Sequence, residues 1–275
     1  MIPTSNNTSK RIAEYLATGK RFDKRKNDEF RDIHIECGIS KKAEGSAKVK
    51  LGKTEVWVGV KLGIGEPYPD SQEEGNMMVT CELTPLSSEK YDYGPPKFNS
   101  IELGRLVDRG IRESKYIDFK KLCIKEGEKV WTVFIDIYSV NDNGNLLDAA
   151  FIATLAALKS AKIPFYDEET EKIDYDKPHV GAIPLTKNIP FNFSVYKIKN
   201  SLILDPNTEE EEASDGRLVL AVIPGNPIKI CSMQKGEENV INEEGFSKML
   251  DLVESKYKDI FPKVEKLIDE AIQNS

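Results

Sequence analysis

Cysteine and histidine are scarce in this chain of 275 residues, which holds four cysteines and two histidines. The cysteines form no Cys-x-x-Cys pair, a pattern that argues against structural zinc and favours buried free thiols in a reducing compartment. They are Cys37, Cys81, Cys123 and Cys231. With only His34 and His179, a histidine-based metal site or a Ser-His-Asp triad has little to draw on. We therefore expect neither a bound metal nor a cofactor.

Long apolar runs are also missing, and no stretch approaches the length of a membrane span. The start, MIPTSNNTSKR, lacks the apolar core of a secretory signal. We expect a cytoplasmic protein that contacts no membrane. The net charge is −7, so the chain as a whole should not attract nucleic acid, and any such contact must come from a local patch.

Charged residues make up 31% of the chain and hydrophobic residues 39%, which is typical of a soluble globular protein. The charged residues are mostly Lys and Glu, the balance found in proteins from hot environments, although a Lys- and Ile-rich genome produces it too. The length suffices for one large domain or two fused halves with a real core.

Hydrophobic periodicity predicts strands and helices in an order that repeats loosely over two halves. In the first half we expect strands at 33–39, 77–83 and 129–140, a hairpin over 45–64 that turns at Gly52 and Lys53, and helices at 101–116 and 146–161. In the second half we expect strands at 193–198, 201–204, 217–223 and 227–233, and a helix at 246–272 that Pro262 could interrupt. Segments 164–178 and 208–215 look like an acidic connector and an acidic loop. The order predicts an α+β fold with mixed sheets covered by helices.

These patterns divide the chain into three parts: an N-terminal helix and connector at 1–30, a first half at 31–165, and a second half with C-terminal helices at 190–275. The N-terminal helix is expected at 8–19, capped by Thr8 or Ser9. The run GKRFDKRKNDEFRD after it mixes charges of both signs, and its composition favours a solvated connector.

The helix predicted at 101–116 carries a row of cations. Arg105, Arg109, Arg112 and Lys115 follow one another at i, i+4, i+7 and i+10, which places them on one face, with Lys115 at its edge. The opposite face is apolar: Leu103, Leu106, Val107, Gly110 and Ile111. Such a face suits a polyanion, but periodicity alone favours a solvated face whose partners are Glu102, Asp108 and Glu113.

Four motifs together resemble the RNase PH family, which includes bacterial RNase PH, polynucleotide phosphorylase and the exosome ring subunits. In chain order they are RFDKRKNDEFRDI, GSAKVKLGKTEVWVGVK, FNSIELGRLVDRGIRES and NDNGNLLDAAFIATLAALKSAKIP. The GSA at 45–47 and GNLLDAA at 144–150 most resemble the non-catalytic RNase PH-like subunit of the archaeal exosome. The resemblance implies an RNase PH-like fold over most of residues 20–260.

Active members of this family are phosphorolytic 3′→5′ exoribonucleases, in which inorganic phosphate attacks the last phosphodiester of RNA. That chemistry requires cations and backbone N–H groups around phosphate, and a carboxylate near the scissile bond. Where active members have an arginine pair, this chain has Phe98, Asn99 and Ser100. Where they have a small hydroxyl residue and an arginine, it has Asn145, Leu146 and Leu147. The position of their aspartate aligns with Arg217.

The departures predict a subunit with no catalytic residues, inactive by itself. By resemblance it would form a hexameric ring of three heterodimers with a catalytic homologue, bind cap subunits, and hold single-stranded RNA through Arg112, Arg109, Arg105 and Lys115. Two alternatives remain open. A slip of one or two residues would make Asp215 a catalytic acid and the chain a nuclease in its own right. The chain could instead be an RNA-binding module that forms no ring.

Overall fold

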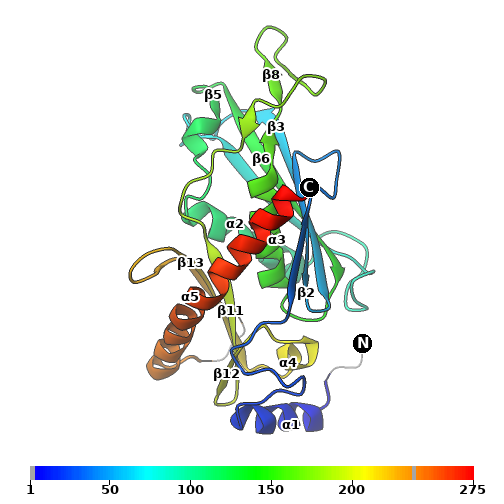
Figure 1. The fold of residues 1–275 in the computed structure, drawn as a ribbon, viewed down its shortest axis with the longest axis vertical. Coiled ribbons are helices and arrows are strands. Elements are labelled where there is room, and N and C mark those ends of the chain that lie inside the picture. The colour runs from blue at the N-terminus through cyan, green and yellow to red at the C-terminus, as the bar shows by residue number, and fades with distance from the viewer. Residues whose placement is uncertain (1–3, 237–239) are drawn as a thin grey trace.

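The computed structural model describes residues 4–236 and 240–275, and within them the two halves form two main sheets that share one core (Figure 1). The first sheet has the strand order β1-β2-β3-β6-β4, with β5 beside β6. Its strands are β1 (Ile33–Cys37), β2 (Gly45–Leu51), β3 (Thr54–Gly65), β4 (Asn76–Leu83), β5 (Cys123–Lys125) and β6 (Lys129–Asn141). The sheet is mixed, as expected, because β4 runs parallel to β6 while the other pairs are antiparallel.

The second half forms an antiparallel sheet in the order β12-β11-β13-β14. Its strands are β11 (Phe191–Ile198), β12 (Ser201–Leu204), β13 (Gly216–Ile223) and β14 (Lys229–Gly236). The segment that joins the two halves in the sequence forms two small sheets: β7 (Lys162–Ile163) pairs with β10 (Gly181–Ala182), and β8 (Phe165–Asp167) pairs with β9 (Lys172–Asp174). The segment predicted as an acidic connector therefore contains a hairpin, which projects from one end of the molecule (Figure 1).

Helix α3 (Leu146–Ser160) lies at the centre and packs on β2, β3 and β11. It is buried from Leu146 to Leu158, as its apolar residues on all sides predict. Helix α2 (Phe98–Glu113) covers β4 and also contacts α3 and β14. A Cβ at Gly110 would come within 2.4 Å of the Phe151 ring, so glycine allows α2 to approach α3 closely. The two helices thus bring the first sheet and the second sheet to one junction.

Helix α5 (Glu243–Gln273) crosses both halves and contacts β1, β11 and α3 (Figure 1). The expected interruption near Pro262 is wrong, because the helix continues through the proline. A proline inside a helix removes one backbone hydrogen bond. Burial of apolar side chains on both sides of Pro262 offsets this loss; they are Met249, Val253, Tyr257, Val264 and Ile268. No helix among the described residues is long and apolar enough to cross a membrane.

The N-terminal helix α1 (Asn6–Ala17) begins two residues before the predicted start. Ser5, rather than Thr8 or Ser9, caps it by accepting a hydrogen bond from the Thr8 N–H. Ile12 and Leu16 pack with residues of β11 and β12 in a second, smaller cluster. The N-terminal helix is therefore attached to the second half, although the first half follows it in the sequence.

The charged run after α1 is not a solvated connector, and that interpretation was wrong. Arg21 is 3% exposed and pairs with Glu210 through both Nε and Nη2. Arg25 and Arg31 both bond to the buried carboxylate of Asp205. Composition cannot reveal this arrangement, because the carboxylate partners lie more than 170 residues further along the chain.

The predicted acidic loop at 208–215 contains a short helix, α4 (Thr208–Glu212), so that prediction was also wrong. Asn207 and Glu210 form a capping box, in which each side chain bonds to the other residue's backbone N–H. Glu210 is buried against Arg21, and Glu211 points into the junction of the two halves. A run of glutamates favours a solvated loop when only the sequence is considered, because acidic side chains are seldom buried without a partner.

Candidate functional site

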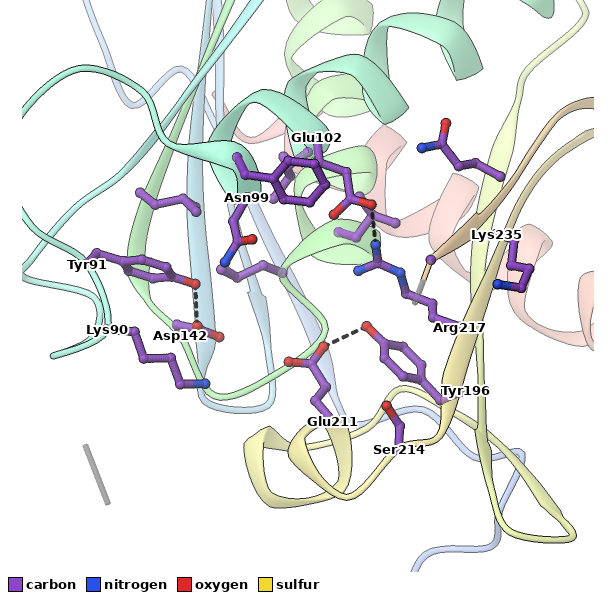
Figure 2. A pocket seen from close by; sticks show the side chains of 17 residues that line it. Lys90, Tyr91, Asn99, Glu102, Asp142, Tyr196, Glu211, Ser214, Arg217 and Lys235 are labelled. Atoms are coloured by element: carbon purple, nitrogen blue, oxygen red, sulfur yellow. Dashed lines mark hydrogen bonds and ion pairs between the residues drawn. The ribbon is translucent and has the colours of Figure 1, made fainter. Parts of the chain in front are cut away.

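A cavity of about 530 Å³ opens where the first turn of α2, the start of α3, α4 and the strands β13 and β14 meet (Figure 2). The sequence predicted three changed positions around a phosphate site, and residues from all three groups line this cavity: Phe98 and Asn99, Leu146 and Leu147, and Arg217. The structure thus brings together side chains that lie more than 110 residues apart.

Arg217 lies on β13 and pairs with Glu102 of α2, with 2.8 Å between Nη2 and Oε1 (Figure 2). Burial works against the charged guanidinium, but its contacts with Tyr196 and Glu102 raise the pKa of Arg217 above the ordinary value. The position therefore holds a permanent cation that an internal carboxylate neutralises. It can neither donate a proton at neutral pH nor act as a metal ligand.

Glu211, on α4, faces the cavity beside the start of α3 and is partly buried (Figure 2). Its Oε1 accepts hydrogen bonds from the Tyr196 hydroxyl at 2.7 Å and from the Asn145 backbone N–H at 2.8 Å. Burial raises the pKa of Glu211 above its ordinary value. The Glu211 carboxylate thus accepts the hydrogen bond of the Asn145 N–H at the turn into α3. The N–H groups at helix N-termini commonly bind anions in this way.

The turn into α3, at Gly144 and Asn145, packs closely against the backbone of Asn207 and leaves no space for a side chain at Gly144. Gly144 has φ +85°, and a Cβ there would lie 2.5 Å from the Asn207 carbonyl carbon. Asn145 follows in the left-handed conformation, with φ 55° and ψ 40°. Its side chain donates to Asp148 and Asp205 at 3.0 Å each. The first turn of α3 is thereby locked against the segment that leads into α4.

Two lysines of the cavity wall were not found by sequence reasoning. Lys90, from the connector before α2, pairs with Glu212 at 3.3 Å. Lys235, on β14, also lines the cavity. Neither belongs to a recognisable motif, since a lysine in a polar connector or near a strand end looks like an ordinary surface residue. The lining therefore mixes the cations Lys90, Arg217 and Lys235 with the acids Glu102, Asp142 and Glu211.

Asp215, the alternative catalytic acid, does not line the cavity, whereas its neighbour Ser214 does. The Asp215 carboxylate accepts hydrogen bonds from the backbone N–H and the ammonium of Lys199. Although burial opposes the shift, these hydrogen bonds lower the pKa of Asp215. A lowered pKa and a position outside the cavity lining both argue against a role as proton donor here.

The predicted cationic row is only partly on one helix face. Arg105 and Arg109 are exposed on α2, and neither forms an ion pair with any residue that the structure describes. Arg112 is half-buried, pairs with Asp108 at 2.7 Å and donates to the Met77 carbonyl. Lys115 is exposed but lies beyond the helix, which ends at Glu113, and has φ 54°. Arg105, Arg109 and Lys115 are therefore exposed and have no ion-pair partner in the described part of the chain, whereas Arg112 is neutralised by Asp108.

A buried acid behind the cavity was also missed. Asp148, in the first turn of α3, accepts hydrogen bonds from Asn145, Asn192 and both the hydroxyl and the N–H of Ser194. Burial raises the pKa of Asp148 to about 6, against the effect of those hydrogen bonds. A single acid inside an otherwise apolar helix is the sequence signal that could have identified this junction between the halves.

Comparisons with known proteins place this geometry in context. The models of the 3′ exoribonuclease family match the chain at residues 29–164 for domain 1 and 188–255 for domain 2. The exosome complex component Rrp42 of Methanothermobacter thermautotrophicus is 40% identical over 260 residues, which cover 94% of each chain. A chain of the Archaeoglobus fulgidus exosome with RNA bound to the active site superposes with a TM-score of 0.84 at 39% identity, covering 93% of this chain and 96% of that one. A chain of an archaeal exosome core gives a TM-score of 0.79 at 37% identity, with 94% and 96% covered.

Proposed function

Because the chain belongs to the RNase PH-like 3′ exoribonuclease family, we propose that it is a non-catalytic ring subunit of an archaeal exosome. The family resemblance expected from the four motifs is confirmed by both domain models and by relatives near 40% identity. Those relatives carry the name exosome complex component, and the superposed structures are exosome structures. They support membership of the same kind of complex.

One observation carries the proposal that this subunit is inactive by itself. Arg217, ion-paired with Glu102, stands where the resemblance puts the aspartate of active members. Phosphorolysis also needs cations for the attacking phosphate, but Phe98 and Leu146 supply none, and the Asn145 N–H is engaged by Glu211. A phosphate that entered the cavity would meet Glu211 at the turn where active members bind it.

The assembly that follows is a hexameric ring of three heterodimers, in which this chain alternates with a catalytic homologue and carries RNA-binding cap subunits. We expect it to act in the cytoplasm on single-stranded RNA. The chain's own contribution is to complete the ring and to hold RNA near the partner's active site. Support comes from the relatives named as components of such complexes and from the RNA-bound Archaeoglobus fulgidus exosome.

Within the subunit, the exposed row on α2 is the proposed RNA contact. Arg105 and Arg109 are the main phosphate ligands, since each has an exposed guanidinium without an ionic partner in the described chain. Arg112 is a weaker ligand because Asp108 already neutralises it. Lys115 extends the row past the helix end. Arginine can bind a phosphate through two parallel N–H groups and makes no contact with the base in doing so. Such binding is independent of the RNA sequence, as an exoribonuclease complex that degrades many RNAs requires.

Reconstitution tests this function directly. Phosphate-dependent release of nucleoside diphosphates from RNA would be measured for this chain alone, for the catalytic homologue alone and for the two mixed. We expect the purified chain to release none, and the mixture to assemble and degrade RNA. Release by this chain alone would refute the proposal and support the alternative in which Asp215 is catalytic. A lone monomer that binds RNA but never assembles with the homologue would support the module without a ring.

A further inference from the structure

Phe98, the first residue of α2, leaves 74% of its surface exposed and lies at the rim of the cavity. A single exposed apolar side chain needs no special explanation. Phe98, however, is not isolated. Ile101, one turn further along, is 53% exposed, and Arg105 and Arg109 follow on the same side of the helix.

The positions of these side chains on α2 form a line. Taking Phe98 as the origin, a helix of 3.6 residues per turn puts Arg105 and Arg109 within about 20° of it and Ile101 about 60° away. From Phe98 to Arg109 the line is about 16 Å long at a rise of 1.5 Å per residue. The line begins with the two arginines, which have no ion-pair partner among the described residues. It then passes Ile101 and ends at the Phe98 ring at the rim of the cavity.

We propose that Phe98 is a base-stacking residue for single-stranded RNA, placed at the end of the α2 arginine row where the strand reaches the cavity. The inference rests on the proposed function, in which Arg105 and Arg109 bind RNA phosphates. A cationic track together with aromatic rings is how proteins hold single strands without sequence preference, because every base has a face that can stack. Phe98 has no hydrogen-bonding group, so it adds affinity and position without selecting a base.

The neighbouring charges favour RNA over a protein partner as the occupant. Arg105 and Arg109, both on the same line, have no carboxylate partner among the described residues, so the helix face that leads to Phe98 presents uncompensated positive charge. A polyanion with planar rings matches both the cations and the phenyl ring. Phe98 acts as a positioning residue: it fixes where the strand lies while the chemistry takes place in the partner.

The test uses this chain assembled with its catalytic homologue, and short labelled oligoadenylate whose affinity is measured at several salt concentrations. Phe98→Ala and Phe98→Leu should weaken binding by about 5- to 150-fold, the range found for losing one base–aromatic stack. Phe98→Tyr, which keeps an aromatic ring, should bind with the wild-type affinity. The slope of log K against log salt should stay unchanged in all three variants, because no phosphate contact is lost.

Two controls separate this inference from the proposed function. Arg105→Gln with Arg109→Gln should weaken binding and make the salt slope shallower by about 0.7 for each lost phosphate contact. Tyr175→Ala removes another exposed aromatic side chain, 61% exposed and outside α2, and should change nothing. If the arginine variant has no effect, the proposed RNA path fails. If it weakens binding while Phe98→Ala does not, only the stacking inference fails.

An RNA substrate provides an independent check. A single abasic nucleotide, moved stepwise along the oligonucleotide, should at one position weaken the wild-type complex and leave the Phe98→Ala complex unaffected. Equal affinity of Phe98→Leu and wild type would show that the phenyl ring does not stack. Dissociation of the assembly by Phe98→Ala, measured by size-exclusion chromatography with light scattering, would show that Phe98 is a protein contact. Either result would overturn the inference.

Discussion

The buried carboxylate of Asp205 leads to a prediction about how strongly its ion pairs with Arg25 and Arg31 stabilise the fold. Its side chain is 0% exposed and accepts from Arg31 Nε at 2.9 Å, Arg31 Nη2 at 2.6 Å and Arg25 Nη1 at 2.9 Å. The Arg31 backbone N–H and the Asn145 amide complete its partners. One carboxylate therefore joins the connector after α1, the turn into α3 and the second half.

Asp205→Asn keeps the shape of the side chain and removes its charge. Two guanidinium groups whose side chains are 11% and 10% exposed would then lack their shared counter-ion. Removing one partner from a buried ion pair typically costs about 3–5 kcal/mol. That is a large share of the 5–15 kcal/mol by which folded proteins are usually stable. We expect a decrease of this size in the free energy of unfolding.

Equilibrium unfolding in guanidinium chloride at neutral pH, followed by circular dichroism, measures the decrease from the shift in the midpoint. Asp215→Asn is the matched control, since its carboxylate pairs with the exposed Lys199 and should cost about 0–1 kcal/mol. A double-mutant cycle with Arg31→Gln should show a coupling free energy between the two sites. A loss below 1 kcal/mol in Asp205→Asn, no larger than in the control, would refute the reasoning.

Three further changes have clear expected results. Gly144→Ala should lower the free energy of unfolding by at least about 1–3 kcal/mol, because Gly144 has a positive φ and an added Cβ would collide with the Asn207 backbone. Gly181→Ala, which has open space around it, should leave the free energy of unfolding unchanged in the same experiment. Arg217→Asp should not give the isolated chain phosphate-dependent nuclease activity, since the leucines at the start of α3 still supply no phosphate ligand; measurable release of nucleoside diphosphates would contradict this. Arg112→Glu should slow RNA decay by the assembled ring without dissolving it, and unchanged affinity and rate would return that residue to a structural role with Asp108.

The regular elements of this fold could be predicted from the sequence because their burial follows a simple period. The strands at 33–37, 129–141 and 191–198 alternate or run apolar, and α3 is apolar all round, as the structure has them. End positions were less accurate. Helix α2 starts three residues earlier than predicted, because the apolar Phe98 lies on the exposed face and so does not continue the period of the buried residues.

The buried polar parts could not be predicted, for a physical reason. A charged residue is buried only where a distant partner compensates it, and a local window contains no sign of that partner. Arg21 pairs with Glu210 across 189 positions, and Asp205 with Arg31 across 174. The glutamates of α4 looked solvated for the same reason. The resemblance to the family pointed to three separate positions in the sequence, and the structure brings residues from all three to one cavity.

The attachment of the N-terminal segment also affects the order in which the chain can fold. Arg21, Arg25 and Arg31 leave the ribosome early, but the carboxylates of Asp205 and Glu210 are made more than 170 residues later. At about 5–20 residues per second, the segment waits about 10–40 s during synthesis before its partners exist. In that interval the arginines lack the Asp205 and Glu210 carboxylates, and helix α1 lacks the strands β11 and β12 on which it packs. Helix α1 and the connector that follows it are therefore synthesised first, but they can pack in their final position only after the second half has folded.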